Sequence, residues 1–204
     1  MVEEIVNAAQ EAVRASQKLL EEKAVTFIND VSSVIADCYR MEGKVLVTGN
    51  GGSLCDGMHF AEELTGFFRG KRRALGAIPL SDPAHMSCVG NDLGFEAVFS
   101  RAVEALGRSG DVFICLSTSG NSSNLVEAVK VAREKELTTV AFLGKKGGAL
   151  TGHVDYEWVV DGFETSDRIQ EAHMAAAHIM IEMIEKKLGL AQAAACEHVS
   201  SLSP

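Results

Sequence analysis

Apolar residues recur at helical spacing along the first forty residues of the chain. Between residues 2 and 39 they include Ile5, Ala12, Leu19, Val31 and Ile35, and neither proline nor glycine interrupts the pattern. Such spacing places the apolar side chains on one face of a helix. The pattern predicts one long N-terminal helix, or two helices in line.

Beyond residue 40 the pattern changes to short apolar runs that alternate with helical stretches. Runs rich in β-branched residues occupy 44–48, 75–80, 111–116, 138–143 and 156–160, and helical spacing returns at 55–68, 95–106, 124–135 and 169–188. Each pair of parallel strands needs a crossover connection, usually a helix. The alternation therefore predicts an α/β fold with a flavodoxin-like, doubly wound, five-stranded parallel sheet. The order of its strands stays open.

The length of 204 residues fits one well-cored domain. We assign it to residues 1–190, including the N-terminal helical region. Residues 191–204 are small and polar after Gly189 and are predicted to be a flexible tail. The two terminal helical regions stand outside the alternation, so their apolar faces should pack against each other or against another subunit.

Composition and charge narrow the function classes. A formal net charge of -9 at pH 7 argues against a nucleic-acid partner, which needs a basic face. No apolar run reaches the ~18 residues that span a bilayer, and the first residues carry acids where a secretory signal carries bases. We therefore expect a cytoplasmic protein that makes no contact with membranes. Five scattered cysteines without a CxxC pair fit reduced thiols.

Two predicted strands end in turns suited to a ligand, because open parallel sheets bind ligands at the carboxyl ends of their strands. In the first turn, Gly49 to Ser53, glycines let the backbone approach a ligand, and Ser53 is expected to cap the next helix. The second turn, Ser117 to Ser122, gathers hydroxyls at a helix N-terminus, which favours an anion such as a phosphate monoester. Such residues are also common in strand-to-helix turns without a ligand. Neither turn carries a P-loop lysine or a dinucleotide fingerprint, so we expect no nucleotide and favour a phosphorylated sugar.

Titratable residues gather on two of the predicted helices. His59 and Glu63 stand four residues apart and therefore share one helix face, although a solvated surface would look the same. His178 lies among alanine, isoleucine and methionine residues, where a histidine can equally be a core or interface residue. The spacing alone leaves both alternatives open.

Four strings in series resemble the bacterial phosphoheptose isomerase family of the sugar isomerase (SIS) superfamily. They are GNGGSLCDGMHFAEELTG, SCVGNDLGF, LSTSGNSSN and DRIQEAHMAAAHIMIEMIE, and the resemblance runs from about residue 40 to residue 188. It implies conversion of D-sedoheptulose 7-phosphate to D-glycero-D-manno-heptose 7-phosphate through a cis-enediol, the first step towards ADP-heptose for lipopolysaccharide. It also implies a homotetramer whose active sites lie between subunits.

The resemblance also assigns roles to individual residues. Glu63 and His178 would be the acid/base pair, and zinc, bound in some members, would have as ligands His59, Glu63, Gln170 and His178. The phosphate would be held by Ser117, Thr118, Ser119 and Ser122. The rest of the substrate would meet Asn50, Gly51, Gly52, Ser53, Glu63, Asn91, Asp92 and Gln170.

Two points qualify these assignments. A metal-bound Glu63 would be a poorer base, and the eight residues from Gln170 to His178 correspond to ~12 Å of helix rise, a long way for two ligands of one ion. Many relatives also have an arginine after the ELTG string, where this chain has Phe67, Phe68 and then Arg69. Either a basic substrate contact is lost, or Arg69 supplies it.

Two other functions compete with this assignment. A SIS protein that binds and regulates a replication initiator is disfavoured, because a scaffold does not need Glu63 and His178 together. An isomerase of another sugar phosphate fits the GNDLGF and DRIQEAH strings less well.

Overall fold

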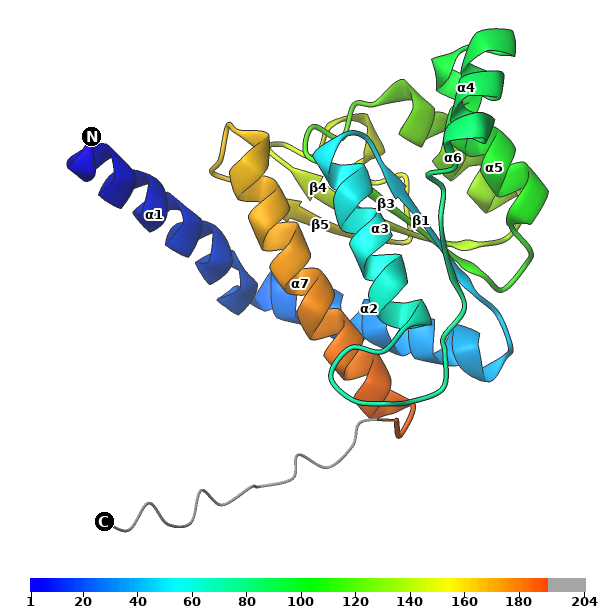
Figure 1. The fold of residues 1–204 in the computed structure, drawn as a ribbon, viewed down its shortest axis with the longest axis horizontal. Coiled ribbons are helices and arrows are strands. Elements are labelled where there is room, and N and C mark those ends of the chain that lie inside the picture. Colours follow the sequence, from blue (N-terminus) through cyan, green and yellow to red (C-terminus); the bar gives the residue numbers. More distant parts are fainter. Residues whose placement is uncertain (191–204) are drawn as a thin grey trace.

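The computed structural model describes residues 1–190, and the predicted tail lies outside them. Its centre is one five-stranded, all-parallel sheet in the order β2-β1-β3-β4-β5 (Figure 1). The strands are β1 (Val45–Gly49), β2 (Ala77–Pro79), β3 (Val112–Ser117), β4 (Thr138–Gly144) and β5 (Tyr156–Val160). The predicted flavodoxin-like, doubly wound sheet is confirmed.

Helices cover both faces of the sheet, which explains why its strands are apolar throughout. Alternate residues of β1 face opposite sides: Val45 and Val47 belong to one apolar core and Leu46 to the other. The first core is completed by α2 (Glu22–Arg40), α3 (Gly52–Thr65) and α7 (Ser166–Lys187). The second is completed by α4 (Pro83–Asp92), α5 (Val98–Leu106) and α6 (Ser123–Glu134). The result is a three-layered domain.

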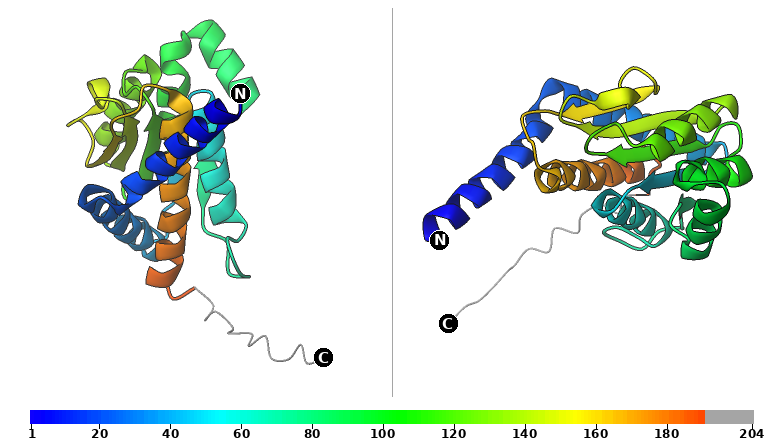
Figure 2. Two further views of the ribbon diagram at one scale, coloured as in Figure 1. Left: turned by 90° about the vertical axis from the view of Figure 1, so that its left-hand side faces the viewer. Right: turned by 90° about the horizontal axis from the view of Figure 1, so that it is seen from above.

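The N-terminal region forms two helices that are not in line, so that part of the prediction is wrong. The first helix, α1 (Val2–Gln17), leads into a 3₁₀ turn at Lys18–Leu20 and then into Glu21, whose backbone is extended (φ -70°, ψ 141°). Lys18 and Lys23 flank the break, and their Nζ atoms lie 2.6 and 3.2 Å from the carboxylate of Asp161 after β5. These ion pairs tie the break to the sheet. Because the chain changes direction at Glu21, helix α1 points away from the layers (Figures 1 and 2).

One helix was missing from the prediction. Helix α4 begins after Asp82, whose carboxylate accepts a hydrogen bond from the backbone N–H of His85 at 2.6 Å, and Pro83 fills its first position. Both are helix-start signals. The helix is short and weakly amphipathic, however, so the apolar spacing did not indicate a helix there. Within residues 1–190 no helix combines the length and the apolar character needed to cross a bilayer. The cytoplasmic location stays a prediction.

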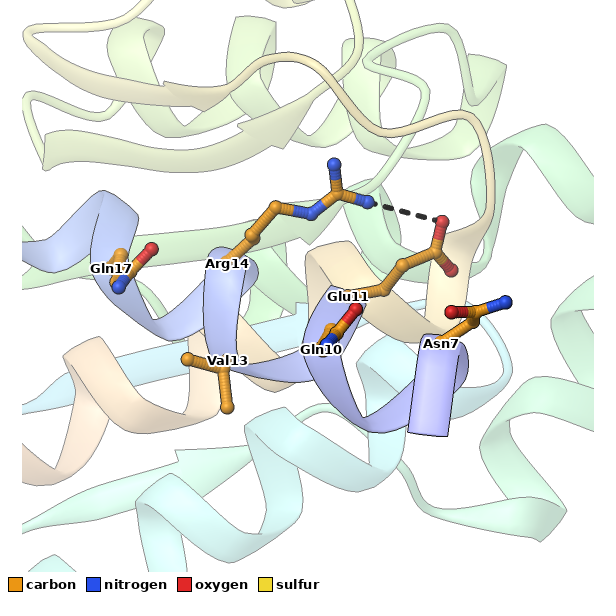
Figure 3. Close-up of a pocket in the computed structure, with 6 residues that line it drawn as sticks. All are labelled: Asn7, Gln10, Glu11, Val13, Arg14 and Gln17. Carbon is orange, nitrogen blue, oxygen red and sulfur yellow. Dashed lines mark hydrogen bonds and ion pairs between the residues drawn. The ribbon is translucent and has the colours of Figure 1, made fainter. Parts of the chain in front are cut away.

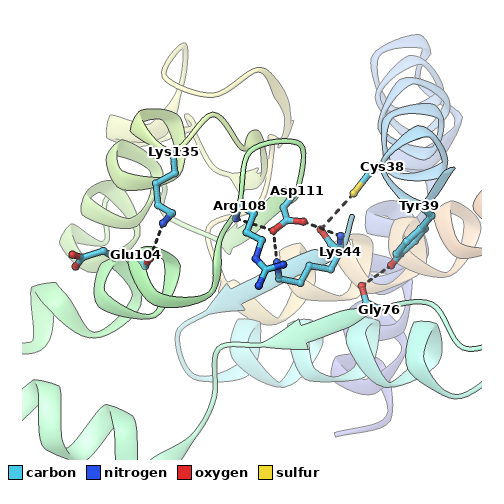
Figure 4. Close-up of polar contacts among 8 residues, drawn as sticks. All are labelled: Cys38, Tyr39, Lys44, Gly76, Glu104, Arg108, Asp111 and Lys135. Carbon is cyan, nitrogen blue, oxygen red and sulfur yellow. Dashed lines mark hydrogen bonds and ion pairs between the residues drawn. The ribbon is translucent and has the colours of Figure 1, made fainter. Parts of the chain in front are cut away.

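The amino edge of the sheet is held by one buried carboxylate. Asp111 accepts hydrogen bonds from the backbone N–H of Lys44 at 3.0 Å, from that of Arg108 at 2.9 Å, and from Lys44 Nζ (Figure 4). Cys38 lies beside them, donating to the carbonyl of Lys44 at 3.5 Å, and burial raises the pKa of its thiol to about 11. These contacts join α2, β1 and β3 and leave the opposite, carboxyl edge open for a ligand.

Candidate active site

The two predicted turns meet at the point where strand order reverses. Strands β1 and β3 are neighbours, with Gly49 of one opposite Leu116 of the other, so the turns after them emerge side by side. A cavity of about 270 Å³ lies there, lined by Asn50, Gly52, Ser53, Leu116, Ser117, Thr118, Ser119, Ser122, Ser166 and Gln170. None of these ten residues is charged. Hydroxyl, amide and backbone N–H groups make up its polar lining.

The first turn approaches the cavity through its backbone. Gly51, with φ +57°, takes the position that caps α3, so the expected capping role of Ser53 is wrong: Ser53 lies inside the helix and is buried. A side chain at Gly52 would lie 2.6 Å from the amide of Gln170. Asn50 exchanges two amide hydrogen bonds with Asn124 of α6, at 3.0 and 2.9 Å. This pair joins the two turns, and spacing gave no sign of it because its members are 74 residues apart.

The second turn presents hydroxyls above the start of α6. The backbone N–H of Gly120 donates to Ser117 Oγ at 3.0 Å. The hydroxyl oxygens of Thr118 and Ser166 lie 3.0 Å apart, which brings the first residue of α7 to the turn. Helix α6 begins after Ser122, whose side chain makes no capping bond, so N–H groups of its first turn are left for an anion. Ser166 was not among the predicted site residues.

Helices α3 and α7 bring the acid/base candidates together. His59 Nε2 lies 3.0 Å from His178 Nε2 and 3.6 Å from Glu63 Oε1, although His59 and His178 are 119 residues apart in sequence. Ligand atoms of the three residues all lie within 4.8 Å of one another. Donors bound to one zinc ion at ~2.0–2.1 Å in tetrahedral geometry lie about 3.3 Å apart. Two of the three spacings, 3.0 Å and 3.6 Å, are close to this value, so the trio could hold a metal ion after small movements of its side chains.

Gln170 contacts the first turn and lines the hydroxyl cavity. It lies inside the second turn of α7, which is continuous from Ser166 to Lys187, and its Nε2 donates to Ser53 Oγ at 3.3 Å. Gln170 is therefore held in a regular part of the helix. A zinc-ligand role for Gln170 stays a prediction.

Two of the predicted substrate contacts lie elsewhere in this protomer. Asn91 and Asp92 end α4, are exposed, and pair with each other through Asn91 Nδ2 and Asp92 Oδ1 at 2.6 Å. Neither lines the cavity between the two turns.

Burial shifts the pKa values of two titratable groups on the helices of the site, and in both cases it favours the neutral form. His173 of α7 is fully buried, its Nε2 bonds to the carbonyl oxygen of Leu143 at 2.9 Å, and burial lowers its pKa to about 4. It is therefore a neutral core residue. In the first half of α3, burial raises the pKa of Asp56 to about 6, opposed by the charge of His59.

Arg69 and Phe68, which follow α3, both contact side chains of α7. Its guanidinium lies 2.8 Å from the carboxylate of Glu182 and 5.0 Å from the centre of the Phe68 ring. Phe68 in turn stacks on the imidazole of His178, with ring centres 5.7 Å apart and planes at 26°. Phe67 is exposed. In this protomer Arg69 is thus engaged with α7 and does not line the hydroxyl cavity.

Comparison with known proteins agrees with this architecture. The SIS domain family model matches residues 10–144. The chain is 49% identical over 185 residues to the phosphoheptose isomerase of Sodalis glossinidius, covering 90% of this chain and 95% of that protein. It is 54% identical over 156 residues to that of Fusobacterium nucleatum, covering 76% and 80%. Among solved structures, the phosphoheptose isomerase of Neisseria gonorrhoeae superimposes with a TM-score of 0.83 at 37% identity, covering 91% of this chain and 100% of that one.

Proposed function

Because the chain belongs to the SIS domain family, and within it to the phosphoheptose isomerases, we propose that it converts D-sedoheptulose 7-phosphate into D-glycero-D-manno-heptose 7-phosphate. The observation that carries the proposal is the meeting of Glu63, His178 and His59 on two adjoining helices. On the same helix as His178, Gln170 links α7 to the hydroxyl cavity. One end of a phosphorylated ketose can then be held while the other end reacts.

The isomerisation needs two proton transfers at carbon and two at oxygen. A base removes a proton from C1 while the C2 carbonyl oxygen gains one, which gives a cis-enediol. The O1 hydroxyl then loses its proton and C2 receives one, so the aldehyde forms at C1. We assign the carbon base to Glu63, since a carboxylate suits that step. His178 is assigned the transfers at oxygen or the return step, since imidazole ordinarily changes charge near neutral pH.

The phosphate is assigned to the second turn. Ser117, Thr118, Ser119 and Ser122 line the cavity, and the N-terminus of α6 adds N–H groups and the positive end of the helix dipole. Asn50, Gly51, Gly52, Ser53 and Gln170 are assigned to the sugar beyond it. Phosphate binding and proton transfer are thus assigned to different residues, because Glu63 and His178 are not part of the cavity lining.

We also propose zinc at the trio His59, Glu63 and His178, with Gln170 of the same or a neighbouring subunit as a fourth ligand. Bound there, zinc would polarise oxygen atoms of the substrate. Protein purified without chelator is expected to carry about one zinc per chain by elemental analysis, and EDTA should lower its activity. A metal-free preparation with full turnover, unchanged by added zinc, would contradict the proposal.

A homotetramer with sites between subunits is the proposed assembly. Helix α1 leaves apolar residues exposed, namely Val2, Ile5, Val6 and Val13. A cavity of about 520 Å³ over this helix is lined by residues of α1 alone, so no other element within residues 1–190 closes it (Figure 3). A second copy would cover this surface, and a neighbour could supply Asn91 and Asp92. Light scattering should give four times the chain mass of 21.8 kDa.

The decisive test of function is a comparison of substrates. The purified protein is incubated separately with sedoheptulose 7-phosphate, fructose 6-phosphate and ribulose 5-phosphate, and each aldose product is followed. The heptulose phosphate is expected to give the highest kcat/KM. A preference for either shorter sugar would identify another sugar-phosphate isomerase, and no turnover of any of them would favour a partner-binding regulator.

A further inference from the structure

The segment that follows α3 runs beside α7 and contacts one face of it at successive turns. We call residues 66–73 the α7 strap; in Figure 1 it leaves the end of α3 and passes the C-terminal half of α7. Phe68 stacks on His178, Arg69 pairs with Glu182, and Arg72 pairs with Glu185. Residues 178, 182 and 185 are spaced four and three apart, so they share one helix face. The strap therefore follows the face of α7 that carries the proposed acid/base histidine.

Arg72 anchors the strap to both catalytic helices. Its side chain is 2% exposed, and its Nε donates to Glu185 Oε1 at 2.7 Å. Its Nη atoms donate to backbone carbonyls at the end of α3: Glu63 at 2.7 Å, Leu64 at 2.8 Å and Gly66 at 2.9 Å. These carbonyls lack intrahelical partners, and a cation there also meets the negative end of the helix dipole. One planar guanidinium thus joins the peptide of Glu63 to the helix of His178, which a lysine could not reproduce.

Phe68 acts on the imidazole itself. Its ring is partly buried, lies nearly parallel to that of His178, and has Arg69 on it at 5.0 Å. A stacked ring restricts rotation of the imidazole plane. The imidazole so held keeps its Nε2 edge 3.0 Å from His59 Nε2. A ring free to rotate would lose this alignment with the trio.

We propose that Phe68 and Arg72 are positioning residues of the isomerase: Phe68 fixes the plane of the His178 imidazole, and Arg72 fixes the distance between the helices of Glu63 and His178. The inference rests on the proposed function in taking Glu63 and His178 as the reacting pair. Neither residue touches the substrate in this role. Misplacement of a catalytic group by about 1 Å can cost ~100-fold in rate.

The first test replaces the ring while keeping an apolar side chain. We expect Phe68→Leu to lower kcat for sedoheptulose 7-phosphate about tenfold or more, with KM changed less than about twofold. Phe68→Tyr, which keeps the ring, should restore the wild-type kcat. Phe67→Leu is the matched control, because it removes an exposed ring from the preceding position and should leave both constants unchanged. Equal losses in Phe68→Leu and Phe67→Leu, or no rescue by tyrosine, would overturn the proposal.

A second readout does not depend on turnover. In the full-length protein, the ring protons of His178 should be shifted upfield in the NMR spectrum by the stacked Phe68 ring. The shift should disappear in Phe68→Leu and persist in Phe68→Tyr and Phe67→Leu. If the protein failed to convert sedoheptulose 7-phosphate, the proposed function would be wrong, but the NMR spectrum would still show whether Phe68 stacks on His178. If the His178 resonance were unchanged in folded Phe68→Leu, the positioning role of Phe68 would be wrong, while the proposed isomerase function would stand.

Arg72 is tested by a conservative change, since a smaller side chain could prevent folding. Arg72→Lys keeps the charge beside Glu185 but loses the planar guanidinium whose Nη atoms bond the carbonyls at the end of α3. It should lower kcat more than KM, whereas Arg73→Lys should change neither. A folded Arg72→Lys enzyme with wild-type kcat would show that Arg72 only supports the fold.

Discussion

Glu63→Gln is expected to lower the kcat for sedoheptulose 7-phosphate by about 10²- to 10⁴-fold, the usual contribution of one positioned proton-transfer group. Glutamine keeps the size of the side chain and can still accept a hydrogen bond, but it cannot take the C1 proton. The phosphate cavity does not include this residue, so calorimetric binding of the ketose phosphate should change by less than about threefold. Incorporation of solvent hydrogen into the substrate should fall in parallel with turnover, because both begin with the same proton removal.

The control for this variant lies one position earlier on α3. Glu62→Gln makes the same chemical change at a residue whose side chain is 68% exposed, against 17% for Glu63. It should retain turnover within about a factor of two. Zinc content measured in both variants separates loss of a base from loss of a metal ligand. Full turnover by Glu63→Gln would show that another group removes the C1 proton.

Gly120→Ala is expected to destroy the second turn. Gly120 has φ +66°, and a β-carbon there would lie 1.7 Å from the carbonyl oxygen of Gly147, far inside contact distance, so backbone must move. The left-handed conformation alone costs a non-glycine residue ~1–2 kcal/mol, and displaced backbone adds to it, so we expect the free energy of unfolding to fall by about 3 kcal/mol or more. Any folded fraction should bind the ketose phosphate poorly. Denaturant unfolding and calorimetry measure the two effects.

A second glycine provides the matched control. Gly152 also has positive φ, +75°, but a β-carbon there meets no atom within 4 Å. Gly152→Ala should therefore cost only the conformational penalty of ~1–2 kcal/mol and leave KM unchanged. Similar losses in both variants would mean that the close approach to Gly147 does not matter.

The sequence predicted the fold well because burial on both faces makes the strands continuously apolar. The run at residues 156–160 coincides with β5 (Tyr156–Val160), and the other four runs fall within three residues of their strands. Helix α4 was missed because its start signals, Asp82 and Pro83, are local while its apolar spacing is weak. The bend at Glu21 was missed because it depends on Asp161, a distant partner.

The site was harder to predict where its parts come from distant segments. The two turns could be found because each places hydroxyls or glycines directly after an apolar run. Spacing showed that His59 and Glu63 share a face, but only tertiary structure brings His178 to 3.0 Å from His59. The stacking of Phe68 on His178 and the amide pair of Asn50 with Asn124 depend on packing between helices and turns. Sequence periodicity cannot show either of them.

The uncharged lining of the hydroxyl cavity has a consequence for how binding responds to salt. Hydroxyl and N–H groups hold an anion by short-range contacts, so dissolved ions have no opposite charge in the lining to screen. The chain as a whole carries a net charge of -9, which repels a dianionic sugar phosphate at long range. Raising the ionic strength weakens that repulsion. Substrate capture should therefore hold steady or improve in moderate salt, where a lysine-lined phosphate site would lose affinity.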